Sequence, residues 1–120
     1  TEKEELLQEK EEETQDLRLK VNESFEEVVQ LAKDNSPEFF TRFREVYPGI
    51  VDELLKIDGK LRTSELTFCA YIFLGFTTKD IAKYTFTSTN TVRNRKYNLK
   101  KKLHLPTEEH MEIWIRNLYS

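Results

Sequence analysis

The sequence predicts an all-α protein, and three observations carry that prediction. Residues 1–33 contain neither Gly nor Pro and are rich in Glu, Lys, Gln and Leu, the composition of a long helix. Further along the chain, apolar residues recur at spacings of three and four, which places them on one face of a helix. Ser, Thr, Pro and Gly stand between these stretches, where helices begin and end. No stretch has the alternation of apolar and polar residues that is typical of a strand.

The composition excludes several classes of protein. The chain has 120 residues, enough for one domain with a modest core, and 34% of them are charged. No apolar run approaches the ~18 residues that span a membrane, and no signal peptide begins the chain. A single cysteine cannot form an internal disulfide, which excludes a disulfide scaffold and favours a cytoplasmic location. Two histidines and one cysteine argue against a zinc finger. Because the single Met is Met111 and the chain starts at Thr1, we expect an excised fragment or a processed chain.

Residues 1–35 are predicted to form an acidic long helix that is a candidate coiled coil. Its second half has residues at spacings of 4, 3, 4 and 3, and these form a heptad seam: Leu17, Val21, Ser24, Val28 and Leu31. A partner helix buries such a seam, most simply in a second copy, so we predict a homodimer. The alternative is a single helix that packs one apolar face onto its own domain: Val21, Phe25, Val28 and Leu31.

Residues 36–62 are predicted to form two connecting helices that pack on the domain. Ser36 is the expected N-cap of the first helix, with Pro37 at its first position. Pro48-Gly49 separates it from a second helix, which ends at Asp58-Gly59. The first helix has one aromatic and apolar face, which we interpret as core rather than as a ligand pocket: Phe39, Phe40, Phe43, Val46 and Tyr47.

Residues 63–120 are predicted to contain four helices. Thr63 or Ser64 caps the first, which ends at Gly75, and its Cys69 is expected to behave as a small buried hydrophobe. The last is capped by Thr107 and has four apolar residues on one face: Met111, Trp114, Ile115 and Leu118.

The two central helices of this region carry the functional prediction. Thr77 and Asp80 form a capping box at the start of a helix of barely two turns. After a tight connection, Ser88 caps a longer helix that extends to about Leu103 and buries three side chains, Val92, Leu99 and Leu103. A short helix that props a longer one is the geometry of a helix-turn-helix, whose second helix enters a major groove about 12 Å wide.

The charge distribution agrees with a polyanionic partner. The formal net charge is −3, but residues 1–35 hold 12 acidic against 5 basic side chains. Residues 79–103 hold 8 basic side chains against one acid, Asp80. Such a dense basic block is the electrostatic signature of a nucleic-acid-binding surface, although a solvated helix face is the simpler alternative.

The stretch Leu66–Leu103 resembles the LuxR/NarL-type C-terminal helix-turn-helix. The family pattern is roughly G-[LF]-[ST]-x-x-E-I-A, five residues, S-x-x-T-V, nine residues and K-L. The matching segments are Gly75–Ala82, Ser88, Thr91-Val92 and Lys102-Leu103. Asp80 replaces the usual Glu, Thr85 stands where the family has an apolar core residue, and Arg95 stands where it often has His. Pro37–Asp58 resembles the segment that precedes this domain in membrane-anchored regulators of Bacteroidetes type.

The resemblance implies a sequence-specific DNA-binding output domain of a bacterial transcription regulator. Its base-reading positions correspond to Arg93, Asn94 and Tyr97. The phosphate contacts correspond to Thr89, Asn90, Lys96, Lys100 and Lys101. Its last helix often mediates dimerisation, which assigns Met111 and Ile115 to self-association or to the core. The implied partners are double-stranded DNA, a second copy, RNA polymerase, and a membrane or sensor region upstream of Thr1.

Two other classes remain as alternatives. A sigma-factor region 4 module resembles the same motif, and a coiled-coil interaction protein could use the basic helix to bind an acidic partner. An enzyme is not expected, because the sequence has no glycine-rich phosphate loop, metal cluster or nucleophile beside a base. We expect no cofactor and no metal.

Overall fold

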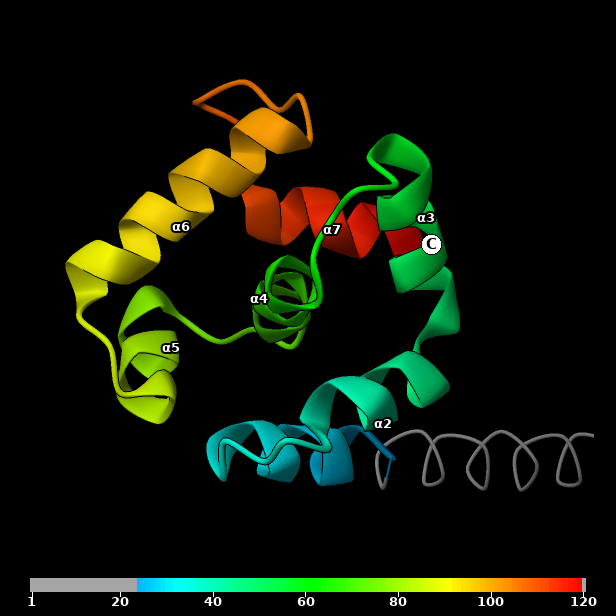
Figure 1. The fold of residues 1–120 in the computed structure, drawn as a ribbon, viewed down its shortest axis with the longest axis vertical. Helices are drawn as coiled ribbons and strands as arrows, with labels where there is room; N and C mark the ends of the chain where they lie inside the picture. The colour runs from blue at the N-terminus through cyan, green and yellow to red at the C-terminus, as the bar shows by residue number, and fades with distance from the viewer. Residues whose placement is uncertain (1–23, 120) are drawn as a thin grey trace, which may run out of the picture.

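A computed structural model describes residues 24–119, and this part of the chain consists of helices joined by turns, without a strand. This confirms the all-α prediction. A helical segment, residues 24–33, comes first, and none of the helices within 24–119 has the length and apolar character needed to cross a bilayer. Six helices follow (Figure 1): α2 (Phe39–Val46), α3 (Pro48–Ile57), α4 (Thr63–Phe73), α5 (Thr78–Thr85), α6 (Thr89–Lys102) and α7 (Met111–Tyr119).

Helix α4 is the centre of the fold. Figure 1 shows it nearly end-on, with the other helices arranged around it. It packs against α2 and α7, and α7 also packs against α3. A helix that is apolar on all sides is stable only when neighbours surround it. The buried residues of α4 meet that condition: Leu66, Phe68, Cys69, Ala70, Tyr71 and Ile72.

The aromatic face of α2 forms part of the core. The Phe39 ring lies 4.9 Å from the ring of Tyr71, centroid to centroid. The Phe43 ring meets Phe73 edge-on, at a centroid distance of 5.8 Å. Tilted and edge-on arrangements of this kind add to the free energy gained from burial. The structure therefore agrees with the interpretation of this face as core.

Residues 24–33 pack on the same domain. Val28 and Ala32 have 0% exposed surface, and the Tyr71 hydroxyl donates a hydrogen bond to the Ala32 carbonyl at 3.5 Å. The prediction that Val28 lies in a dimer seam is therefore wrong, because its side chain already fills the core of its own chain. Leu31 is half-buried against that core. The other two members assigned to the seam, Leu17 and Val21, lie outside the described residues.

Three predicted helix starts differ from the observed ones. Helix α2 begins at Phe39, and the Ser36 hydroxyl accepts the Glu38 N–H in the turn before it. Helix α4 is preceded by Arg62 at the N-cap, and the Glu65 carboxylate accepts its backbone N–H at 3.1 Å. Helix α7 begins at Met111, because residues 107–109 form a turn first.

The capping residues around α5 and α6 are those that the sequence predicts. The Asp80 carboxylate accepts the Thr77 N–H at 3.0 Å, while Thr77 Oγ1 accepts the Asp80 N–H at 3.1 Å. Ser88 Oγ accepts the Thr91 N–H at 3.1 Å. Thr85 stands where the resembled pattern has an apolar residue. Its hydroxyl donates a hydrogen bond to the Ile81 carbonyl at 2.6 Å and so has a partner within α5.

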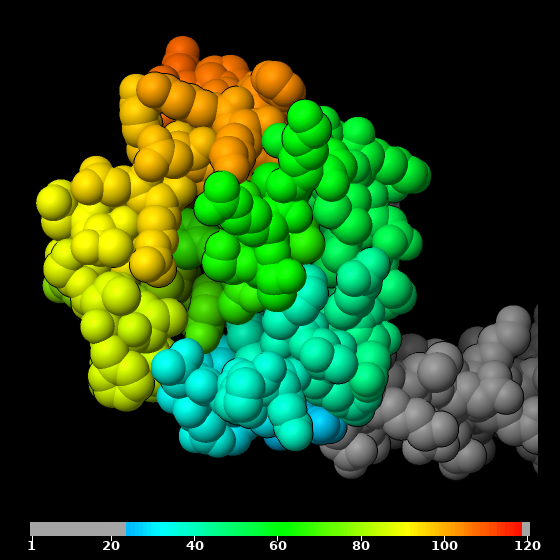
Figure 2. Space-filling model, viewed as in Figure 1, coloured from blue at the N-terminus to red at the C-terminus, as the bar shows by residue number. Residues whose placement is uncertain are grey.

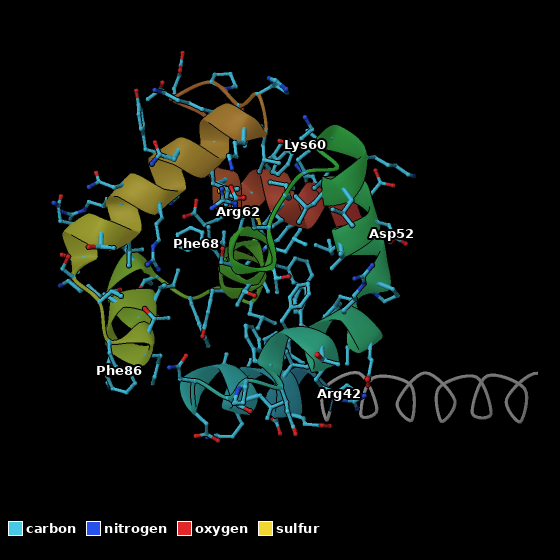
Figure 3. The ribbon with its side chains drawn as sticks, in the orientation of Figure 1. Arg42, Asp52, Lys60, Arg62, Phe68 and Phe86 are labelled. Atoms are coloured by element: carbon cyan, nitrogen blue, oxygen red, sulfur yellow. The ribbon has the colours of Figure 1, made fainter. Side chains whose placement is uncertain are left out.

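Within residues 24–119, four residues past helix ends have left-handed backbone: Asn35, Gly75, Phe86 and His104. Gly75 follows α4 with φ +93°, and the Phe76 N–H reaches back to the Tyr71 carbonyl in a Schellman arrangement. Phe86 ends α5 with φ 57° and is 84% exposed, at the outer edge of the molecule in Figure 3.

Candidate nucleic-acid interface

The buried side of α6 determines which of its residues face solvent. Val92 and Leu99 are buried along the helix, and Leu103 is buried just after its end. The rest of α6 carries six basic side chains and no acidic one. Because α5 packs against α6, the capped start of α5 is held beside this basic helix.

The predicted base-reading residues lie on the exposed surface of α6. Arg93 and Asn94 are exposed, and Tyr97 is 49% exposed. The Lys101 ammonium lies 4.4 Å from the centroid of the Tyr97 ring, a cation–π contact that orders the exposed aromatic side chain.

A shallow groove, here called the α6 groove, brings four of the eight predicted DNA-contacting residues together. It is lined by residues of α6, by the start of α5 and by the turn before α7: Thr78, Arg93, Lys96, Tyr97, Lys100 and Thr107. Lys100 donates a hydrogen bond to the Thr107 carbonyl at 3.0 Å, which holds its ammonium at this groove. Asn94 and Lys101 are not among the groove residues and lie farther around the helix.

Lys96 is the one predicted phosphate-binding residue that forms an ion pair among the described residues. Its ammonium bonds to the Glu112 carboxylate of α7, and its side chain is only 26% exposed. Burial raises the pKa of Glu112, but the hydrogen bonds from Lys96 and the Glu112 backbone, together with the charges of Lys96 and Lys100, outweigh that effect and hold this pKa below its ordinary value. The charge of Lys96 is therefore balanced within the chain.

Thr89 and Asn90 occupy the first turn of α6. Thr89 is half-buried, and Asn90 is exposed. The backbone N–H groups of a first helical turn have no partner within the helix, and they are suited to bind phosphate oxygens.

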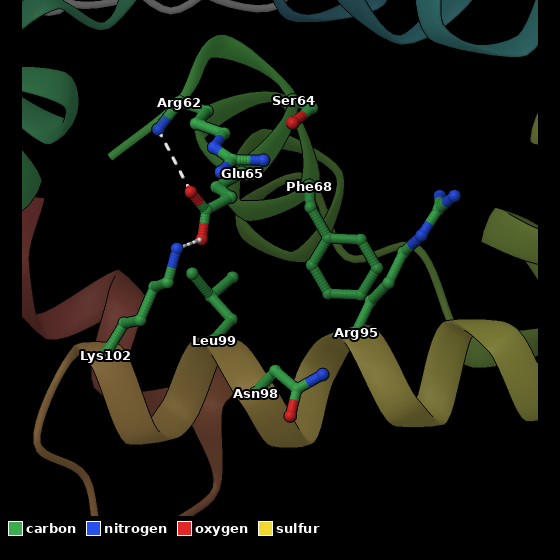
Figure 4. Close-up of a pocket in the computed structure, with 8 residues that line it drawn as sticks. All are labelled: Arg62, Ser64, Glu65, Phe68, Arg95, Asn98, Leu99 and Lys102. Atoms are coloured by element: carbon green, nitrogen blue, oxygen red, sulfur yellow. Dashed lines mark hydrogen bonds and ion pairs between the residues drawn. The ribbon is translucent and has the colours of Figure 1, made fainter. Parts of the chain in front are cut away.

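A second feature was not predicted from the sequence. A cleft of about 590 Å³, here called the α4–α6 cleft, opens between the start of α4 and the side of α6 away from the α6 groove (Figures 2 and 4). Its lining residues are Arg62, Ser64, Glu65, Phe68, Arg95, Asn98, Leu99 and Lys102. The spacing of three and four between Arg95, Asn98 and Lys102 could have indicated a shared face of α6. Nothing in the sequence indicates that Arg62, some thirty residues earlier, joins them.

In comparisons with known proteins, no family model, curated protein or solved structure matches this chain.

The two residues of α7 assigned to dimerisation belong to the core. Met111 and Ile115 have 0% exposed surface, so neither can form a contact with a second copy in this fold. The prediction that Met111 and Ile115 mediate self-association is therefore wrong, and the alternative, that they belong to the core, holds. Among residues 111–118 of this helix, the exposed large apolar side chain is that of Ile113.

The groups that could support catalysis are few in the described part of the chain. Cys69 is fully buried, and this burial raises the pKa of its thiol to about 12, far from the value a nucleophile requires at neutral pH. Between residues 24 and 119, no three His, Cys, Asp or Glu side chains are grouped so that they could hold a metal ion.

Proposed function

We propose that this chain binds double-stranded DNA through α6, as the output domain of a bacterial transcription regulator. In this proposal α4 to α7 are the four helices of a LuxR-type domain, and α5 and α6 are its helix-turn-helix. The observation that carries the proposal is the exposed face of α6, where Arg93, Asn94 and Tyr97 stand beside basic side chains on a helix with a capped, accessible start.

Each exposed side chain has a chemically matched target in the major groove. The Arg93 guanidinium can donate two hydrogen bonds to the O6 and N7 atoms of guanine. The Asn94 amide can pair with the N6 and N7 atoms of adenine in the same way. Tyr97 can contact a thymine methyl group or a phosphate.

The remaining contacts would go to phosphate groups, which set affinity and position without specifying sequence. Thr89 and Asn90 would act at the start of α6, and Lys100 and Lys101 along its second half. Lys96 joins them only if DNA displaces its carboxylate partner on α7.

A homodimer stays part of the proposal, with a smaller surface than the one predicted. Val28, Met111 and Ile115 are buried in the core, so the seam would depend on Leu17 and Val21, together with the half-buried Leu31. A symmetric dimer would place two half-sites about 34 Å apart, one turn of the duplex.

The experiment that tests the proposal is a selection of duplex sequences from a random pool, followed by affinity measurements on the selected and a random duplex. Arg93→Ala should weaken binding to the selected duplex by about 5- to 150-fold (~1–3 kcal/mol) and barely change binding to the random one. Arg44→Ala is the matched control, because Arg44 is also an exposed arginine and lies on α2.

Two results would count against the proposal. An equal loss on both duplexes would reduce Arg93 to a phosphate contact and remove the argument for base recognition. The absence of any binding, even at low salt, would overturn DNA binding itself and favour an acidic protein partner for α6.

A further inference from the structure

The proposed contacts leave the basic α4–α6 cleft unexplained. Arg95 and Asn98 line this cleft from one side of α6, whereas Lys96 and Lys100 line the α6 groove on the other side. The exposed Asn94 and Lys101 lie between the two sides. Helix α6 therefore has a cationic flank on each side of its exposed face.

The cleft contains positive charge that the chain does not balance. Lys102 pairs with Glu65 at 2.7 Å, and this ion pair closes one end of the cleft (Figure 4). Burial raises the pKa of Glu65, but the hydrogen bonds from Lys102 and the Arg62 backbone, together with the charges of Lys102 and Arg62, outweigh it and keep the pKa below its ordinary value. Within residues 24–119, Arg62 and Arg95 form no ion pair with a carboxylate.

The two cationic side chains come from different helices and line a single opening. Figure 3 shows Arg62 and Phe68 between α4 and α6, and Figure 4 shows Arg62 and Arg95 on either side of the Phe68 ring. Phe68 and Leu99 are both buried apolar side chains, and they provide an apolar floor beneath the charged groups. Ser64 and Asn98 add a hydroxyl and an amide that can donate hydrogen bonds.

The dimensions of the duplex suggest what binds there. A helix with its side chains is about 10–12 Å across, and the major groove is about 12 Å wide. A helix in the groove therefore has one phosphodiester strand along each of its flanks.

We infer that the α4–α6 cleft receives the backbone of one DNA strand, while the backbone of the other strand runs along the opposite flank of α6, beside Lys100. Arg62 and Arg95 bind phosphate oxygens, Ser64 and Asn98 donate further hydrogen bonds, and the apolar floor contacts deoxyribose. This inference rests on the proposed function, and it adds the start of α4 to the DNA-binding surface.

The test measures the salt dependence of affinity for a fluorescently labelled random duplex. Each phosphate that a cation neutralises contributes about −0.9 to the slope of log affinity against log salt. Removing both cations, in Arg62→Ala/Arg95→Ala, should therefore make the slope less steep by about 1.8. An increase in salt from about 50 to about 200 mM weakens DNA binding by both proteins. The drop in affinity should be about 12-fold smaller for the variant than for the wild type.

Two further variants make this result specific. Arg44→Ala/Lys56→Ala removes two exposed cations from α2 and α3 and should leave the slope unchanged. Asn98→Lys adds a cation to the cleft and should make the slope steeper by about 0.9. Circular dichroism and thermal unfolding of every variant check that the fold is retained.

The outcomes separate this inference from the proposed function. A steep slope in the wild type that neither the double cleft variant nor Asn98→Lys changes would overturn the role of the cleft and leave DNA binding by α6 intact. An equal change in the cleft and control variants would overturn it as well, since net charge alone would explain both. No DNA binding by the wild type would overturn both proposals.

Discussion

Replacing Glu112 with Gln should increase the salt dependence of DNA binding, because it releases a cation of α6. Helix α6 has six basic side chains, of which Lys96 pairs with Glu112 and Lys102 with Glu65, so four lack an ionic partner in the described part of the chain. Arg93 is assigned to a base, so at about 0.9 per cation the other three contribute about −2.7 to the slope, and a released Lys96 brings this to about −3.6. Between about 50 and about 200 mM salt, the loss of affinity due to α6 should grow from about 40-fold to about 150-fold.

The assay is fluorescence anisotropy with a random duplex over a series of salt concentrations. Glu53→Gln is the matched control, because it removes the same charge and separates a lysine, Lys56, from its carboxylate partner in α3. The Lys96–Glu112 pair is partly exposed, so Glu112→Gln should cost at most about 1 kcal/mol of stability. If Glu112→Gln and Glu53→Gln change the slope equally, Lys96 does not lie at the DNA interface and the assigned orientation of α6 is refuted.

Two further predictions concern the stability of the fold. Gly75→Ala should lower the free energy of unfolding in urea by about 1–2 kcal/mol, since an L side chain is strained at φ +93° and its Cβ would lie 3.2 Å from Arg116 Nη2. A Cβ atom at Gly49 would have no atom within 4 Å, so Gly49→Ala should not lower the free energy of unfolding. Equal losses of stability in the two variants would contradict this account. Asp80→Asn should make stability less dependent on pH, because hydrogen bonds from the Thr77 backbone and side chain hold the pKa of Asp80 below 3.8. Above about pH 5 the wild type should be more stable than Asp80→Asn by about 0.3–1 kcal/mol, and this difference in stability should disappear as the pH falls through that lowered pKa. A difference that persists in stronger acid would disprove that the ionised Asp80 carboxylate stabilises the start of α5.

The limits of α5 and α6 were predictable because local chemistry determines them. Thr77, Asp80 and Ser88 each bond to a backbone group within three residues, so neighbours in the sequence are sufficient to identify the caps. Where a helix start depends on tertiary packing, the prediction failed. Met111 begins α7 with its side chain in the core, although Thr107 has the chemistry of a cap.

The dimer seam was mispredicted for a different reason. Heptad spacing indicates that Val28 needs an apolar partner, but it does not indicate whether the partner belongs to the same chain or to a second copy. In this fold the partner is the core around α4, which also encloses Ile115.

The candidate site was predictable on one side of α6 only. Arg93, Asn94 and Tyr97 belong to a single helix, and helical periodicity places them relative to the buried Val92. The α4–α6 cleft combines this helix with Arg62, and such a pairing requires the packing of whole helices.

The most direct test of DNA binding by α6 is the mapping of backbone amide chemical shifts by NMR as duplex DNA is added. Binding through α6 predicts that the largest shifts occur within residues 88–101, at the first turn of α5 and at the start of α4, with small shifts in α2 and α3. Shifts centred on α2 and α3, or no shifts at low salt, would contradict the claim that α6 is a DNA-binding helix.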